Sequence, residues 1–176
     1  MARNTLSRSL HDVGLAAWFG GTLANAVALN AASAEARGAK GSAKVADEGW
    51  DRWTPVNAAA IGAHLVGSVG QLAGNRRRVA RQQGVAGMSA LKTLLTAAAL
   101  GVTAYSRSLG RVAHGSPARS GTRPSKVSRK QAAAAREQLD RLQWVVPALT
   151  GALVWVSSYA GEQQRPGEVA RGVAQR

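Results

Sequence analysis

Polar side chains recur at helical spacing within an otherwise apolar stretch of the chain, residues 54–74. They are Asn57, His64, Ser68 and Gln71, and Asn75 continues the pattern just beyond the stretch. At about 100° per residue, this spacing places them on one face of a helix. On the inner face of a membrane helix such groups could form a ligand pocket, carry a proton or hydrogen-bond to a neighbouring helix.

Three other apolar stretches, at about 12–33, 86–107 and 142–161, carry similar lines of polar residues. These lines are His11, Trp18, Thr22 and Asn25; Lys92, Thr96, Thr103 and Ser106; and Gln143, Thr150 and Ser157. Each expected helix therefore has one polar seam. The seams could enclose a cavity, or they could bond the helices together at about 0.6 kcal/mol per hydrogen bond. Serine and threonine also bond to their own backbone, which favours the structural interpretation.

Two histidines are candidate ligands. His64 is expected near the middle of a membrane, whereas His11 stands beside Asp12 at the start of the first apolar stretch. A pair of imidazoles could hold a haem axially. The two histidines are expected at different depths, however, so the sequence predicts no metal site and no cofactor, with haem as the less favoured alternative.

Several kinds of catalysis are excluded or disfavoured by composition. The chain has no cysteine, which rules out thiol nucleophiles and thiolate metal sites. Aspartate and glutamate are essentially absent from the interiors of the apolar stretches, so paired carboxylates have no obvious place there. No phosphate-binding loop, zinc-protease motif or nucleophile elbow is present.

The four stretches themselves predict the architecture. A helix needs about 20 residues to cross the hydrocarbon core, and the third stretch reaches that length only if Lys92 lies within it. None of the stretches shows the charged face typical of a soluble helix, which disfavours a soluble bundle. We therefore expect an all-α, single-domain bundle of four transmembrane helices over residues 1–176. A flexible basic linker is expected at 110–130.

The net charge of +14 is concentrated between the apolar stretches. Arg76, Arg77, Arg78 and Arg81 follow the second stretch and are expected to contact anionic lipid headgroups rather than nucleic acid. The short basic loop predicts cytoplasmic termini, although the longer third connector, which is also basic, argues the reverse. The alanine- and arginine-rich composition is typical of a bacterial protein, so the bacterial inner membrane is the expected location.

A short pattern occurs twice. Residues 48–53 and 137–142 both read Glu-x-apolar-Asp-Arg-apolar in outline, and each precedes an apolar stretch. Duplication of a helical hairpin would explain the repetition and would give a bundle of two hairpins. Chance similarity is the alternative.

The segment His11 to Gly21, with a histidine followed by Trp18 and a Gly-Gly pair, resembles the first helix of several small bacterial membrane families. Among these are copper-resistance-type and anthrone-oxygenase-like membrane domains, and the whole layout resembles actinobacterial four-helix membrane proteins. The resemblance implies a membrane bundle and no particular activity. We favour a non-enzymatic accessory, scaffold or small-molecule-binding protein, which could associate with other membrane subunits or a second copy. A membrane enzyme or redox protein using His64 is the alternative.

Overall fold

The computed structural model describes residues 4–36, 38–114, 129–162 and 165–174, and all the regular structure in these residues is helical. The elements are α1 (Thr5–Ala24), the π-helical turn η1 (Asn25–Leu29), α2 (Asn30–Glu35), α3 (Gly38–Arg81), α4 (Val85–His114), α5 (Arg129–Leu142), α6 (Val145–Glu162) and α7 (Pro166–Ala174). The prediction of an all-α protein is therefore confirmed for the described residues.

The first three elements form one helical rod. The backbone stays helical through both junctions, at Asn25 and Asn30, so η1 is a local widening within the rod and not a break. The rod ends at Ala36, which is extended, and Gly38 then takes a positive φ of 71° to begin α3. Gly84, with φ of 80°, makes the equivalent tight turn between α3 and α4.

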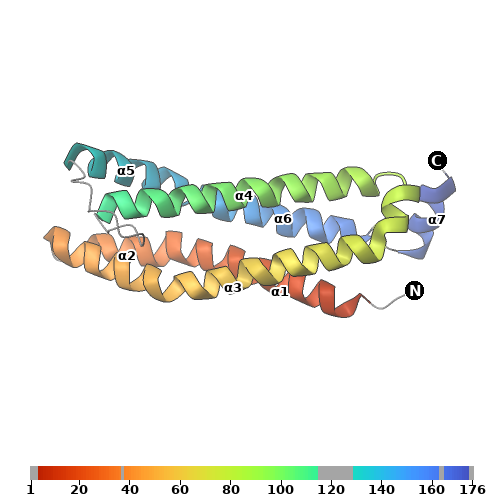
Figure 1. Ribbon diagram of the computed structural model, residues 1–176, viewed down its shortest axis with the longest axis horizontal. Coiled ribbons are helices and arrows are strands. Elements are labelled where there is room, and N and C mark those ends of the chain that lie inside the picture. The colour runs from red at the N-terminus through yellow and green to blue at the C-terminus, as the bar shows by residue number, and fades with distance from the viewer. Residues whose placement is uncertain (1–3, 37, 115–128, 163–164, 175–176) are drawn as a thin grey trace, which may run out of the picture.

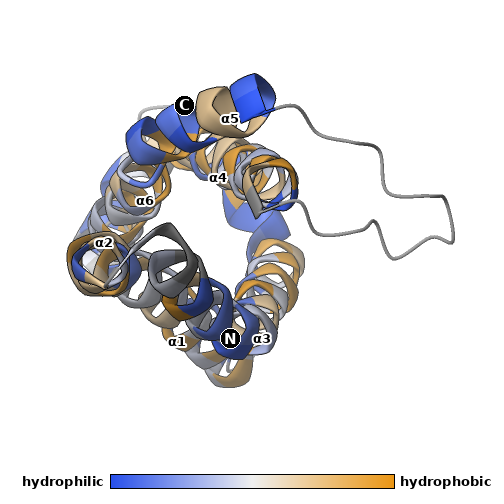
Figure 2. Ribbon diagram, turned by 90° about the vertical axis from the view of Figure 1, so that its left-hand side faces the viewer, coloured by the Kyte–Doolittle hydropathy of each residue, from blue (hydrophilic) through white to orange (hydrophobic). Residues whose placement is uncertain are grey.

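The α1–α2 rod, α3, α4 and the consecutive helices α5 and α6 form four rods, which run side by side along the long axis of the molecule (Figure 1). The α1 rod packs mainly against α3, and α4 packs mainly against α5 and α6 (Figure 2). The central core takes one buried residue from each rod: Trp18, Ala60, Ala99 and Val146. Two antiparallel pairs of helices thus meet around a common axis.

Three described segments are long and apolar enough to cross a membrane: Thr5–Glu35, Val85–Ala113 and Arg129–Glu162. They contain the predicted spans 12–33, 86–107 and 142–161. The predicted span 54–74 lies within α3, which does not meet the same criterion. Its polar seam, from Asn57 to Gln71, lowers the mean hydropathy of an otherwise apolar stretch.

The two ends of the predicted linker 110–130 are helical. The helix α4 continues to His114 and α5 begins at Arg129, while residues 115–128 lie outside the described part of the chain.

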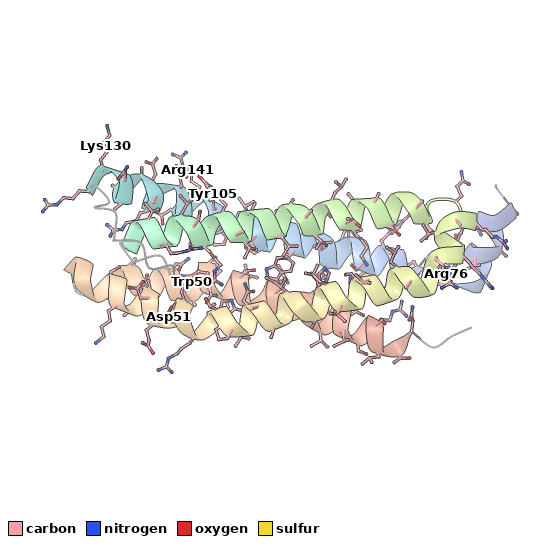
Figure 3. The ribbon with its side chains drawn as sticks, viewed as in Figure 1. Trp50, Asp51, Arg76, Tyr105, Lys130 and Arg141 are labelled. Carbon is pink, nitrogen blue, oxygen red and sulfur yellow. The ribbon has the colours of Figure 1, made fainter. Side chains whose placement is uncertain are left out.

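Figure 3 places Trp50, Lys130 and Arg141 at one end of the bundle and Arg76 at the other. Charged residues therefore stand at both ends of the apolar rods.

The repeated Glu-x-apolar-Asp-Arg-apolar pattern makes the same local contact in both copies. Arg52 pairs with Glu48 at 2.6 Å, and Arg141 pairs with Glu137 at 2.6 Å. Both pairs are exposed and four residues apart, so they support their own helices by a few tenths of a kcal/mol.

Glycines bring α1 and α3 into backbone contact. A Cβ atom added at Gly14 would lie 2.5 Å from both the carbonyl oxygen of Ala60 and the backbone nitrogen of His64. A Cβ atom at Gly67 would collide with the backbone nitrogen of His11 and lie 2.6 Å from the carbonyl oxygen of Ser7. Small residues at such positions are what allow membrane helices to approach closely.

Candidate functional site

Two buried histidines meet where α1 and α3 approach most closely. The rings of His11 and His64 have centroids 4.6 Å apart, and the side chains are 1% and 0% exposed. The indole of Trp18, also 0% exposed, has its centroid 6.0 Å from that of His64. A compact aromatic cluster therefore occupies the inner face of the α1–α3 pair.

Hydrogen bonding assigns the protons on both rings. The Nδ1 atom of His64 lies 3.4 Å from the carbonyl oxygen of His11, which can only accept, so Nδ1–H donates. The Nε2 atom of His64 then accepts from the hydroxyl of Thr96 on α4, at 3.3 Å. In the same way, His11 donates from Nδ1 to the carboxylate of Asp12 at 2.8 Å. The imidazole of His64 thus links α3 to α1 and to α4.

The expectation that the two histidines lie at different depths was wrong. The helix α1 begins at Thr5, so His11 is already inside the bundle and at the level of His64. The rings contact each other directly, which leaves no room between them for a porphyrin plane. Among the described residues there is also no group of three or more histidine, aspartate or glutamate side chains that could hold a metal ion.

The residues of the predicted seams lie inside the bundle. His64, Asn57 and Thr22 are buried, and Ser68, Gln71, Asn25, Lys92, Thr96 and Thr103 are partly buried. Several hydroxyls bond within their own helix: Thr22 donates to the carbonyl of Trp18 at 2.8 Å, and Ser68 donates to that of His64 at 2.7 Å. These two hydroxyls contribute no bond between helices.

Other seam atoms are buried with no partner in the described part of the chain. They are Nε2 of His11, Nε1 of Trp18, Nδ2 of Asn25, Oδ1 of Asn57, Nε2 of Gln71 and the hydroxyls of Thr103, Ser106 and Ser157. Each such group costs free energy unless a water molecule or ligand satisfies it. Of these residues, His11 and Gln71 line the cavity described next.

A cavity of about 420 Å³ lies between α3 and α4. These two helices share only a few contacts with each other, although they are consecutive in the chain. The cavity is lined by apolar residues, among them Leu65, Leu72, Met88 and Leu100, and by polar ones: His11, Ser68, Gln71, Asn75, Arg78, Ser89, Lys92, Thr93 and Thr96. It therefore joins the α1 and α3 seams to that of α4 on one side of the histidine cluster. His64 is absent from its wall.

Lys92 is the basic residue that α4 contributes to this wall. It lies seven residues beyond Val85, which begins α4, so it is roughly 10 Å from the end of the helix. No ion pair or hydrogen bond of its ammonium group is found among the described residues. Asp12 and Arg8 are the charged groups that act on it electrostatically, and the Asp12 carboxylate is already bonded to His11.

The predicted headgroup-binding arginines divide into two kinds. Arg76, Arg77 and Arg81 are exposed, as expected of residues that face lipid headgroups. Arg78 is partly buried, lines the cavity and donates to the side-chain oxygens of Gln82 and Asn75 at 3.0 and 3.4 Å. Partial burial, with the charge of Arg8 nearby, lowers the pKa of Arg78, but a guanidinium stays protonated at neutral pH.

Some contacts at the ends of the bundle could not be predicted from the sequence. Asn30 donates to Gln143 at 2.8 Å, which ties α2 to the α5–α6 junction. At the opposite end, the amide of Gln83 donates to the carbonyl of Gly172 at 3.0 Å, so α7 covers the α3–α4 turn. These partners are more than 80 residues apart, and no local pattern connects them.

Comparison with known proteins adds no relative. No protein family, no curated protein and no solved structure matches the chain significantly.

Proposed function

We propose that this chain is a four-span integral membrane protein of the bacterial inner membrane that binds a small amphiphilic molecule in the cleft between α3 and α4. The observation that carries the proposal is the cavity of about 420 Å³. This volume falls within the usual range for ligand pockets, which are mostly apolar with a few polar groups. A scaffold held together by its seams alone would have no such space.

The fourth span is α3, and its exposed face supports this assignment. Val56 and Val66, which lie outside the cavity wall, are 49% and 63% exposed, whereas Asn57 and His64 are buried. This helix is thus polar inside and apolar outside, an arrangement that suits lipid and not water. It also lies beside the α1 rod, which is one of the three segments that meet the length and hydropathy criterion.

A binding role is favoured over catalysis because the two histidines do not converge on the cavity. His64 is outside the wall, and both its ring nitrogens are engaged by His11 and Thr96. Only His11 reaches the cavity. The polar residues of the wall can position a ligand but form no pair of acid and base.

Two neighbouring alanines on α4 provide a test of the cleft. Both alanines are exposed, but Ala97 lines the cavity and Ala98 is not part of its wall. A photoreactive 18-carbon alcohol, mixed with the protein in phosphatidylcholine nanodiscs, should label α3 and α4 saturably. The Ala97→Trp variant should reduce this labelling about tenfold, since an indole fills the cleft, and Ala98→Trp should not. Labelling that never saturates, or that both variants leave unchanged, would contradict the proposal.

Four spans place both termini and the α3–α4 turn on one side, which we propose is the cytoplasm. The chain has no cysteine, so single cysteines report cleanly on exposure. Ser42→Cys and Ser120→Cys should react with an impermeant maleimide added outside spheroplasts, while Gln83→Cys should react only after lysis. Ser120 lies outside the described residues and tests the third connector. Labelling of Ser42→Cys and Ser120→Cys only from the cytoplasmic side would reverse the orientation.

A further inference from the structure

We infer that the molecule held in the α3–α4 cleft is an anionic amphiphile, an acyl chain that carries a phosphate or carboxylate group, and that Lys92 binds its acidic group. This inference rests on the proposed binding function and specifies the class of ligand. It is carried by the charge and the hydrogen-bonding capacity of the cavity wall.

The charge of the wall is uniformly positive. Among the described residues, Lys92 and Arg78 are the basic side chains that line the cavity, and no aspartate or glutamate lines it. The described carboxylate that acts electrostatically on Lys92 is that of Asp12, which has a 59% exposed side chain outside the wall and is bonded to His11. A cation in a largely apolar cleft is costly unless a counter-charge is supplied. A bound anion would supply it.

Gln71, a neutral residue of the wall, also favours a ligand that accepts hydrogen bonds, whereas the unpaired Nε2 atom of His11 is an acceptor and would bind a donor group of the ligand or a water molecule. The Nε2 atom of Gln71 is buried and has no acceptor among the described residues, and it belongs to the same wall as Lys92. An amide nitrogen and an ammonium group can only donate. Ionised phosphate and carboxylate oxygens can only accept, so they match the ammonium group directly and the amide of Gln71 once its buried nitrogen turns toward the cleft.

The apolar part of the wall provides for an acyl chain. Leu65, Val69 and Leu72 from α3 face Val85, Met88 and Leu100 from α4 across the cavity. The volume of about 420 Å³ accommodates a headgroup and part of a chain, and the rest would extend between the two helices toward lipid. Each methylene buried contributes about 0.8 kcal/mol. The cavity also reaches Arg78, near the end of α3 where headgroups are expected, so a lipid could enter from that leaflet.

The test measures displacement of the photoreactive 18-carbon alcohol in phosphatidylcholine nanodiscs by oleate, by oleoyl lysophosphatidate and by oleyl alcohol. These competitors share one chain and differ in charge. We expect both anions to displace the probe at concentrations about tenfold lower than oleyl alcohol, as a charge-assisted bond implies. The order of the two anions distinguishes a phosphate site from a carboxylate site. Displacement by inorganic phosphate alone would overturn the lipid assignment.

Substitutions then identify the cation. Lys92→Met should remove the tenfold preference and retain binding of oleyl alcohol, while Lys92→Arg should keep the preference. Lys130→Met is the matched control, because it removes the same charge from an exposed position at the far end of the bundle (Figure 3). Equal displacement by charged and neutral competitors, unchanged in Lys92→Met, would overturn the inference and leave the cleft intact. Absence of saturable binding by any 18-carbon compound would overturn the proposed function itself.

Discussion

Replacing Gly67 with alanine is expected to destabilise the bundle by about 1–3 kcal/mol, the usual cost of an overpacked contact. The new methyl group would collide with the backbone of α1 at His11 and at Ser7. Backbone atoms cannot rotate away as a side chain would, so α1 must move away from α3. That movement would separate His11 from His64 and loosen the aromatic cluster. Unfolding in mixed micelles, followed by circular dichroism, measures the loss.

Gly62 is the matched control on the same helix. It is exposed, and a Cβ atom added there meets nothing within 4 Å. Alanine is the better helix former, so Gly62→Ala should be neutral or stabilising by up to about 1 kcal/mol. Equal stability of the two variants would mean that α1 and α3 do not make the close backbone contact on which the histidine pair depends.

The apolar stretches could be read from the sequence because charge interrupts them so clearly. Three of them fall within segments long and apolar enough to span a membrane. The helices nevertheless continue well beyond the predicted limits, as in α3, which runs for 44 residues from Gly38 to Arg81. Alanine, arginine and glutamate are good helix formers, so the charged flanks extend the helices that the apolar stretches begin.

The inward direction of the polar seams could also be predicted, because it depends only on the 3.6-residue period. The residues that each seam contacts on neighbouring helices could not be predicted in this way. His11 appeared to stand at a surface because Arg8 and Asp12 flank it. Its contact with His64 depends on the register of α1 against α3, which is set by the glycines of both helices, including Gly14 and Gly67.

The cavity was still less accessible to sequence reasoning. It exists because α3 packs against α1, and α4 against α6, more closely than α3 and α4 pack against each other. Which pairs of helices pack closely depends on the volumes of side chains from all four rods. The sequence showed that Gln71, Lys92 and Thr96 lie on seams, but it did not show that these residues share one wall.

Trp18 and Trp155 both lie within apolar stretches and illustrate the same limit, since sequence alone does not separate packing residues from lipid contacts. Trp18 is 0% exposed and belongs to the central core, whereas Trp155 is 79% exposed on α6. The Nε1 atom of Trp18 has no partner among the described residues, so its contribution comes from packing and not from a hydrogen bond. Its indole fills the space beside His64 at the level where all four rods meet.

Trp18→Ala should therefore destabilise the protein by about 3–5 kcal/mol, the cost of emptying a large buried site. Trp155→Ala removes the same side chain from an exposed position and should cost less than about 1 kcal/mol. Trp18→Phe should fall between them, because it keeps most of the buried volume and sacrifices no hydrogen bond. Thermal unfolding of the three variants in one detergent measures the order. Equal losses for Trp18→Ala and Trp155→Ala would show that the four rods do not converge on Trp18.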